Sequence, residues 1–288
     1  MPFSVLVSGI KLMTFERGDT LRFFREKQII QGSEFRDVEI VSYTTEQERR
    51  LPRIKKKAVS SLKQIKANDK NSQKHLRWLI NSNFTEEDYR LDLTYENEPL
   101  SLEEAEKKLA NFKRRLKSLY KKHGLELKYI AVTGGGSPKK RGEGLTRIHH
   151  HLIINGGISR DEIEACWSVG RGSKKRSIGR RSCQHLQLKE NEQGFEALAV
   201  YFFQHSKERE KNEKRWSAST NLKQPIERRD DNAFTSLSVA ELLKANENGT
   251  LRSLVERRYQ DYICVDFEVR RNAVTFWPEI YLKLRRRR

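Results

Sequence analysis

The sequence predicts an α+β protein with a central antiparallel sheet and helices on one face of that sheet. Segments with the alternating apolar and polar residues of strands recur between residues 89 and 284, and segments with the spacing of amphipathic helices separate several of them. A short turn joins the last two strand segments, which makes them antiparallel neighbours. Of the 288 residues, 36% are hydrophobic, which is enough for one modest globular domain with basic appendages.

The first clear strand is followed directly by a helix. Apolar and polar side chains alternate over residues 91–96, as in a strand with one buried face. Ser101 and Glu104 have the spacing of a capping box, which predicts the start of a helix. The apolar residues of this helix recur every three or four positions until Gly124, namely Leu102, Ala105, Leu109, Phe112, Leu116 and Leu119. They form a stripe that should pack on the sheet.

The later elements are predicted by the same kinds of signal. Ser159 and Glu162 repeat the capping-box spacing, and the glycine-rich stretch at residues 134–144 is typical of a loop. The expected elements are strands at residues 127–133, 148–155 and 183–188, helices at residues 159–167 and 193–206, and a closing hairpin of strands at residues 263–269 and 274–284.

The predicted domain division has three parts. Residues 1–85 form a basic N-terminal lead-in with one strand, at residues 38–43, and one helix, at residues 73–81. Residues 86–285 form the main domain, which includes the closing hairpin, and residues 285–288 form a basic tail. Because the lead-in is only weakly patterned, we expect no second domain there.

The charge of the chain indicates a polyanionic partner. Lys and Arg number 58 against 39 Asp and Glu, which gives a net charge of +19, and proteins this basic usually bind nucleic acid. The basic residues gather at residues 53–57, 171–181 and 285–288. A solubilising surface is the alternative interpretation of each block.

The block at residues 171–181 has no acidic residue and contains glycine and serine. A flexible basic segment between two ordered elements can close over a phosphate backbone. The predicted nucleic-acid contacts in this block are Arg171, Lys174, Lys175, Arg176, Arg180 and Arg181.

Hydropathy and cysteine spacing indicate the cellular compartment of the protein. No apolar stretch approaches the roughly 20 residues that cross a bilayer, so we expect no membrane association. Cys166, Cys183 and Cys264 are widely spaced and include no C-x-x-C pair, which argues against a disulfide framework and against a zinc knuckle. These features indicate a protein of the reducing cytoplasm.

Five of the seven histidines lie between residues 149 and 205. On a strand, alternate side chains share a face, so His149 and His151 lie about 7 Å apart on one face, while His150 joins the more apolar face. Two imidazoles at this spacing can share one divalent ion. A pair of surface histidines with ordinary hydrogen bonds is the alternative. His150 is assigned to packing or to supporting the ligands.

A tyrosine in the helix at residues 193–206 is a candidate nucleophile. The buried stripe of this helix consists of Phe195, Leu198, Ala199 and Phe202. Tyr201 lies at the border of the stripe, so its hydroxyl can emerge at the sheet surface. Near a metal ion that polarises a phosphodiester, a phenol can attack phosphorus. An ordinary boundary tyrosine is the alternative.

Three features follow one another in a characteristic order: a polar-faced strand at residues 91–95, the histidine run at residues 149–154, and Tyr201 in a following helix. Together they resemble the motifs of the histidine-hydrophobe-histidine (HUH) endonucleases. More narrowly, the chain resembles the rolling-circle replication proteins of bacterial phages, plasmids and integrated elements, which are related to filamentous-phage gene II proteins. The resemblance covers about residues 70–285 and includes residues 129–133, 167–170, 194–201 and 214–225 and the closing hairpin.

The resemblance implies an RRM-like palm and a nicking and joining reaction at a replication origin. In that reaction Tyr201 attacks a DNA phosphate, stays attached to the 5′ end and leaves a 3′-hydroxyl for a polymerase, and a later transfer rejoins the circle. His149 and His151 become metal ligands, with Mg²⁺ or Mn²⁺ as the ion and no small-molecule cofactor. The implied partners are single-stranded or hairpin origin DNA and a host helicase and polymerase, in the cytoplasm of a bacterial host cell.

One departure from the family pattern lies beside the tyrosine. Gln204 stands where the family commonly has a lysine, three residues after the tyrosine. Gln204 and His205 share the helix face of Tyr201, whereas Lys207 reaches back only if the helix ends first. We therefore expect less positive charge beside the phenolate, with Gln204 and His205 as its neighbours.

A second departure concerns the metal. Gly134 stands where the family often has a carboxylate or amide as third ligand. In the usual topology the strand that carries Asp92 lies beside the histidine strand, so Asp92 could supply this ligand, with Glu96 or Glu143 as other options. A hydrogen bond at the surface is the alternative role of Asp92.

Arg215 and Trp216 lie in a short polar segment. Arg215 could contact a DNA phosphate and Trp216 could stack on a base, which is worth about 1–3 kcal/mol. A loop anchored by a buried tryptophan is the alternative.

Two rival functions stay open. One is a conjugative relaxase or single-strand transposase, which shares the chemistry. The other is a non-catalytic basic nucleic-acid-binding protein, that is, a degenerate family member. Gln204 and Gly134 are the sequence reason for keeping the second rival. Covalent attachment of the protein to a 5′ phosphate would separate the two classes, because binding alone leaves no adduct.

Overall fold

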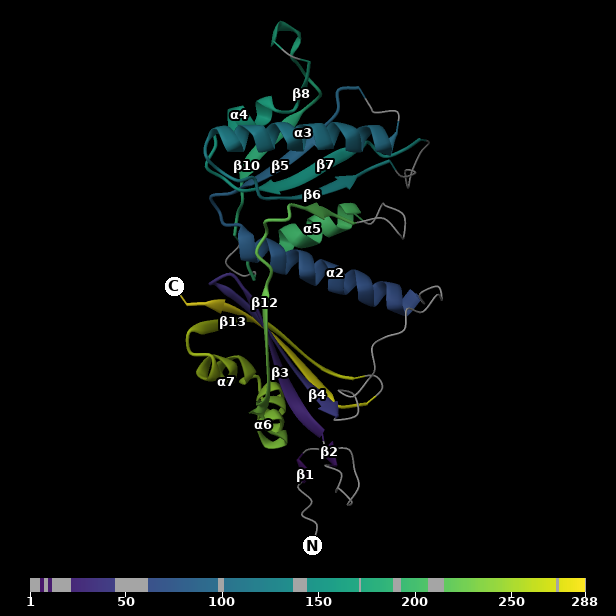
Figure 1. Cartoon of the computed structure of the whole chain (residues 1–288). Helices are drawn as coiled ribbons and strands as arrows, with labels where there is room; N and C mark the ends of the chain where they lie inside the picture. Colours follow the sequence, from purple (N-terminus) through teal and green to yellow (C-terminus); the bar gives the residue numbers. More distant parts are fainter. Residues whose placement is uncertain are drawn as a thin grey trace. The chain divides into compact units, whose positions relative to one another are not determined.

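The computed structural model describes residues 6–7, 10–11, 22–44, 62–97, 101–136, 144–170, 172–188, 193–206, 215–272 and 275–287 (Figure 1). It is an α+β structure with antiparallel sheets, as the sequence predicts. The chain forms two compact units. We call residues 61–224 the central unit, and residues 1–60 together with residues 225–288 the terminal unit.

This division differs from the predicted one. The strand expected at residues 38–43 is β4 (Phe35–Thr44), and it pairs with β14 (Pro278–Arg286), the second strand of the closing hairpin. The first and last parts of the chain therefore build one unit together, and the closing hairpin does not belong to the unit that carries the histidine strand. Sequence patterning shows that a segment is a strand, but it does not show which distant strand is the partner.

The central unit is built on a five-stranded sheet with the order β10-β5-β7-β6-β11, in which neighbouring strands are antiparallel. Its strands are β5 (Tyr89–Thr94), β6 (Tyr129–Gly134), β7 (His149–Ile154), β10 (Arg181–His185) and β11 (Ser217–Ala218), with a separate pair formed by β8 (Ser168–Val169) and β9 (Arg176–Ser177). Its helices are α2 (Leu62–Asn83), α3 (Leu102–Lys122), α4 (Arg160–Ala165), the 3-10 helix η1 (Gly172–Lys174) and α5 (Glu196–Ser206).

Helices cover both faces of this sheet, with α3 on one side and α2 and α5 on the other (Figure 1). The α3 face carries Leu152 and Ile154 of β7, and the opposite face carries Ile153. The prediction of helices on one face alone is therefore wrong. The reason lies in β7, where five of the six residues are buried, because a strand that is apolar on both faces needs cover on both.

The capping signals are confirmed. The Ser101 hydroxyl accepts a hydrogen bond from the backbone N–H of Glu104, and α3 begins at the next residue, Leu102. The Ser159 hydroxyl accepts from the backbone N–H of Glu162 at the start of α4. Each cap satisfies one of the N–H groups that have no partner within the first helical turn. None of the described helices combines the length and the apolar character needed to cross a bilayer.

His150 points to the α3 face and is completely buried. Its Nε2 atom lies 2.5 Å from the hydroxyl of Tyr95, and its Nδ1 atom lies 2.9 Å from the hydroxyl of Thr133. Both ring nitrogens thus form hydrogen bonds on the α3 side of the sheet. This agrees with a packing role for His150, whereas His149 and His151 point to the opposite face.

Trp167 is the largest side chain buried in this core. Its ring lies edge-on to Tyr95 and Phe112, and its Nε1 donates to the Thr94 carbonyl at 3.0 Å. We expect Trp167→Ala to lower the free energy of unfolding by about 3–5 kcal/mol. Urea denaturation would measure this loss. Leu145→Ala, at a position that is 61% exposed, should change it by less than about 0.5 kcal/mol, and equal effects would contradict the assignment.

The terminal unit contains a five-stranded antiparallel sheet with the order β12-β3-β4-β14-β13. Its remaining elements are β1 (Leu6–Val7), β2 (Ile10–Lys11), β3 (Arg22–Gln31), β12 (Ile226–Phe234), α6 (Ser236–Glu247), α7 (Leu251–Arg258) and β13 (Tyr262–Arg271). Apolar residues of α6 and α7, among them Val239, Leu242 and Val255, pack on one face of the sheet against Val38 and Ile280.

Several of these elements are missing from the sequence prediction. One usable signal was present, because Thr235 and Ser238 form a capping box at the start of α6. The predicted tail at residues 285–288 also differs from the structure. Arg285 and Arg286 continue β14, and Arg287 pairs with Glu256 at 2.9 Å. These arginines therefore take part in the sheet and in an ion pair within the terminal unit.

Candidate metal and tyrosine site

Three adjacent strands and one helix bring the candidate residues together in the central unit. His151 of β7 pairs with Asp92 of β5 on one side and with Val132 of β6 on the other, so these three side chains share one face of the sheet. Helix α5 packs on the same face. It places the rings of Tyr201 and His205 within 5 Å of the His151 ring, centroid to centroid.

His149, His151 and His205 form a cluster that could hold a divalent metal ion. One nitrogen of each imidazole lies within 4.8 Å of the others. The Nε2 atom of His149 and the Nδ1 atom of His205 are 3.0 Å apart. The sequence predicts His205 only as a neighbour of Tyr201, whereas the structure places one of its nitrogens where it could serve as a third ligand.

Hydrogen bonds at Nδ1 orient two of the three rings. His149 Nδ1 donates to the Arg147 carbonyl at 2.9 Å, and His151 Nδ1 donates to Asp92 Oδ1 at 2.5 Å. With the proton on Nδ1, the Nε2 atom of each ring keeps its lone pair. Histidines that bind metals are commonly held in this way, with the second nitrogen on a carbonyl or a carboxylate. These contacts thus fix the orientation of the two strand histidines.

Asp92 lies beside His151 on the neighbouring strand, as expected, but it is not a member of the histidine cluster. Its carboxylate accepts from His151 and from Arg90, whose Nε and Nη2 atoms both lie 3.1 Å from Oδ1. Burial opposes ionisation of Asp92, but the hydrogen bond from His151 and the positive charge of Arg90 outweigh it, so the pKa of Asp92 lies below its usual value. Asp92 is therefore an ionised support for His151, and His205 is the third member of the ligand cluster.

Burial also lowers the pKa of His151, although Asp92 acts in the opposite direction. The ring is therefore neutral at neutral pH, which is the form that binds a metal ion. Of the other predicted ligands, Glu96 is exposed, and Glu143 lies outside the described residues.

Gly134 explains why a histidine can complete the cluster. A Cβ atom at this position would lie 2.7 Å from His149 Nε2 and 3.2 Å from His205 Nδ1. A larger side chain at this position would therefore occupy the space in which the two imidazoles meet. The glycine at position 134 and the histidine at position 205 thus belong to one arrangement, in which helix α5 supplies the third imidazole of the cluster.

We expect Gly134→Ala to weaken metal binding about 10- to 100-fold because the new methyl group displaces the His149 ring. The nearest atoms are the tip of a side chain, and Gly134 does not lie in the left-handed region, so the fold should tolerate alanine. Titration of the variant with Mn²⁺ would measure the loss, and thermal unfolding in EDTA is the control. Unchanged Mn²⁺ affinity would contradict this account of the cluster.

Tyr201 lies directly beside the cluster. Its hydroxyl is 3.3 Å from His151 Nε2, and its ring centroid is 4.4 Å from that of His205. The Arg90 guanidinium lies 4.6 Å from the centre of the Tyr201 ring. Burial raises the pKa of Tyr201 and the Arg90 charge partly offsets this rise. Tyr201 is therefore a protonated phenol at neutral pH, with one cation against its face.

The sequence prediction does not include Arg90, and it does not foresee the contacts at Gly134. Arg90 contacts Asp92 and lies over the Tyr201 ring. In a chain with 58 Lys and Arg, one more arginine is no signal of a site. Its position on the polar face of a strand, two residues before Asp92, was the available signal. The role of Gly134 needs the three-dimensional contact with His149 and His205, which no local pattern reveals.

Gln204 and Lys207 are the other residues predicted as neighbours of the tyrosine. Gln204 is exposed, whereas the ring contacts of α5 with His151 come from Tyr201, Phe202 and His205. Lys207 and Arg171 lie outside the described residues.

The basic block after α4 is an ordered protrusion in its described part. Strands β8 and β9 form a small antiparallel pair, and the chain then returns to β5, where the backbone N–H groups of Thr94 and Glu96 donate to the carbonyls of Arg180 and Ile178. Its basic side chains are exposed, namely Lys174, Lys175, Arg176, Arg180 and Arg181. The predicted loop is thus anchored on the strand that carries Asp92.

Arg215 and Trp216 contact other side chains of the central unit. Arg215 pairs with Asp69 at 3.0 Å, and the Trp216 ring stacks on His75 with ring centroids 5.9 Å apart. Trp216 is partly buried against the core formed by α2 and α5. This placement matches the alternative in which a tryptophan anchors the loop, and the DNA contacts expected of this pair stay a prediction.

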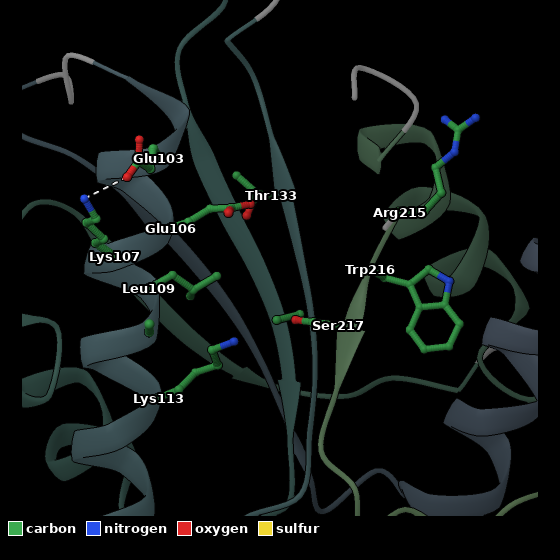
Figure 2. A pocket seen from close by; sticks show the side chains of 11 residues that line it. Glu103, Glu106, Lys107, Leu109, Lys113, Thr133, Arg215, Trp216 and Ser217 are labelled. Carbon is green, nitrogen blue, oxygen red and sulfur yellow. Dashed lines mark ion pairs between the residues drawn. The ribbon is translucent and has the colours of Figure 1, made fainter. Parts of the chain in front are cut away.

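A cleft of about 470 Å³ lies on the other face of the sheet, between α3 and the β6–β11 edge (Figure 2). Its lining includes Glu106 and Lys113 from α3, Thr133 from β6, and Arg215 and Trp216 immediately before β11 (Figure 2). The clustered histidines are not among its lining residues, so the candidate metal site lies outside this cleft.

The comparisons with known proteins assign no family to this chain. No protein-family model, no curated protein and no solved structure matches the chain. The chemical interpretation of the site therefore depends on the contacts described above.

Proposed function

We propose that this chain is a metal-dependent DNA endonuclease and strand transferase that initiates rolling-circle replication. The observation that carries the proposal is the position of the Tyr201 hydroxyl, 3.3 Å from Nε2 of His151 in a cluster of three histidines. A phenol held beside a metal site is suited to nucleophilic attack on a phosphodiester. The resemblance to HUH endonucleases leads to the same chemistry.

The proposed nicking step is a transesterification. The phenolic proton passes to solvent, the Tyr201 oxygen forms a bond to phosphorus, and the bond between phosphorus and the 3′ oxygen breaks. The 3′ oxygen takes a proton from water, which leaves a 3′-hydroxyl and a 5′-phosphotyrosine. Joining is the reverse, in which a 3′-hydroxyl attacks the phosphotyrosine and the tyrosine oxygen regains its proton. The bond energy is conserved in the phosphotyrosine, so no external energy source is needed.

The proposed ion is Mn²⁺ or Mg²⁺, held by His149, His151 and His205. When bound, such an ion supplies neutralisation of charge on the phosphate and holds it in line with the nucleophile. Three imidazole nitrogens suit Mn²⁺ better than Mg²⁺, which prefers oxygen ligands. The orienting contacts of His149 and His151 with a carbonyl and a carboxylate support a metal site over two ordinary surface histidines.

The proposed substrate is single-stranded or hairpin DNA at an origin. The net charge of +19 and the exposed basic protrusion that follows α4 support a polyanionic partner. In this function a host polymerase extends the 3′-hydroxyl and a host helicase separates the strands. The replicon would be a bacterial phage, plasmid or integrated element, and the protein would act in the host cytoplasm.

The experiment is a search for a covalent protein–DNA adduct. The protein is incubated with Mn²⁺ and a set of single-stranded hairpin oligonucleotides labelled at the 3′ end, and the products are separated under denaturing conditions. We expect a labelled species that survives denaturation and whose modified residue, after nuclease digestion and mass spectrometry, is Tyr201. Retention of DNA without any adduct would favour the non-catalytic binding protein.

A further inference from the structure

The structure places one cation against the proposed nucleophile. Arg90 lies on β5, where it pairs with Ile153 of β7, and its side chain therefore shares the face of the histidine cluster. Its guanidinium carbon is 4.6 Å from the centre of the Tyr201 ring. Because 31% of its side chain is exposed, a DNA phosphate could reach Arg90 from solvent.

Arg90 is held in place by Asp92, the residue that also supports His151 of the histidine cluster. Its Nε and Nη2 atoms both contact Asp92 Oδ1, and Nη2 lies 3.0 Å from Asp92 Oδ2. Asp92 in turn accepts from His151, and His151 Nε2 lies beside the Tyr201 hydroxyl. Contacts thus run from Tyr201 through His151 and Asp92 to Arg90 and back to the Tyr201 ring. The carboxylate fixes the orientation of the imidazole and the guanidinium together.

The guanidinium has donors beyond those that Asp92 uses. An arginine side chain carries five N–H groups, and the Asp92 contacts involve Nε and Nη2. A guanidinium presents its five donors in a planar fork, and the two N–H groups of Nη1, which Asp92 does not contact, can donate to phosphate oxygens. A phosphate placed for attack by Tyr201 would lie between the histidine cluster and this fork.

We propose that Arg90 binds the scissile phosphate beside Tyr201 and supplies the positive charge that the lysine three residues after the tyrosine supplies in the family pattern. This inference rests on the proposed function of the site. Gln204, at the lysine position, is uncharged and exposed, whereas Arg90 reaches the tyrosine from the neighbouring strand. The guanidinium stabilises the charge that develops on the phosphate oxygens as the new bond forms.

The test is single-turnover nicking of a suitable hairpin at saturating DNA and Mn²⁺. We expect Arg90→Gln to lower the rate constant about 100-fold, which is the usual effect of removing one charge-stabilising donor. Arg90→Lys should recover part of the rate, since it keeps the charge and loses the fork. Arg114→Gln is the matched control, because Arg114 is exposed on α3, which covers the other face of the sheet.

Metal affinity and chemical rescue separate phosphate binding from mere support of Asp92. If Arg90 binds the phosphate, Mn²⁺ affinity of Arg90→Gln stays at the wild-type value, and millimolar guanidinium ion raises the rate of Arg90→Ala. A fall in Mn²⁺ affinity parallel to the fall in rate, with no rescue, would overturn the proposal and leave Arg90 as a support of the metal cluster. An unchanged rate in Arg90→Gln would also overturn it.

The same assay distinguishes a failure of the proposed nicking function from a failure of the Arg90 proposal. If the wild-type protein forms no adduct with any hairpin, both the nicking function and the role of Arg90 are overturned. If the wild-type protein forms the adduct and Arg90→Gln forms it equally fast, only the role of Arg90 is overturned.

Discussion

Tyr201→Phe should leave no covalent adduct with an oligonucleotide that the wild-type protein cleaves. The variant lacks only the hydroxyl that lies 3.3 Å from His151 Nε2, and its ring can still pack against Phe202 and His205. Removal of a catalytic nucleophile can lower a rate constant by roughly 10⁶-fold, which would put the adduct below detection. The measurement is the fraction of labelled DNA that migrates with the protein after denaturation.

DNA binding by this variant is the control. Binding depends on basic groups outside the phenol, so the dissociation constant of Tyr201→Phe for the same hairpin should match that of the wild-type protein at equal salt concentration. Tyr281→Phe, which changes a tyrosine of the terminal unit, should still form the adduct. Persistence of the adduct in Tyr201→Phe would refute the assignment of the nucleophile.

His205→Ala should abolish metal-dependent cleavage, as should His149→Ala combined with His151→Ala. Each change removes at least one nitrogen from a cluster in which the ligand atoms lie within 4.8 Å of one another. We expect the affinity for Mn²⁺ to fall more than about 100-fold, which exceeds the effect of losing an orienting contact alone. Isothermal titration with Mn²⁺ and cleavage after EDTA treatment would measure the two consequences.

The effect of His205→Ala tests the structure specifically, because the sequence points to the two strand histidines and not to a third. His185→Ala is a matched control, since His185 is an exposed histidine on β10, and its affinity for Mn²⁺ should equal that of the wild-type protein. If His205→Ala binds Mn²⁺ as well as the wild-type protein does, the third ligand is another group and the cluster is incorrectly assigned.

Much of the local structure of the central unit could be predicted from the sequence. The β5 and β7 strands, the caps of α3 and α4 and the partition of His149, His150 and His151 between two faces follow from local periodicity and from capping chemistry. These properties depend on residues that are neighbours in the chain. The proximity of Tyr201 to the histidine strand also agrees with the resemblance to an ordered set of motifs.

Long-range pairing explains what the sequence did not reveal. The terminal unit combines β3 and β4 with strands that begin after residue 224, and only complementary surfaces in the folded chain choose those partners. The cover on both faces of the central sheet has a similar origin, because helices α2 and α5 complete their apolar surfaces only against each other and the sheet.

For the site, the sequence by itself determined the chemical groups: two histidines on one strand face, a boundary tyrosine and a strongly basic chain. Tertiary structure decided how they are used. The close approach of α5 to β6 brings a nitrogen of His205 within 4.8 Å of those of His149 and His151, in space that Gly134 leaves open, and the pairing of β5 with β7 places the Asp92 carboxylate against His151. Distances between side chains on different elements set these roles, and such distances exist only once the sheet and helix have packed together.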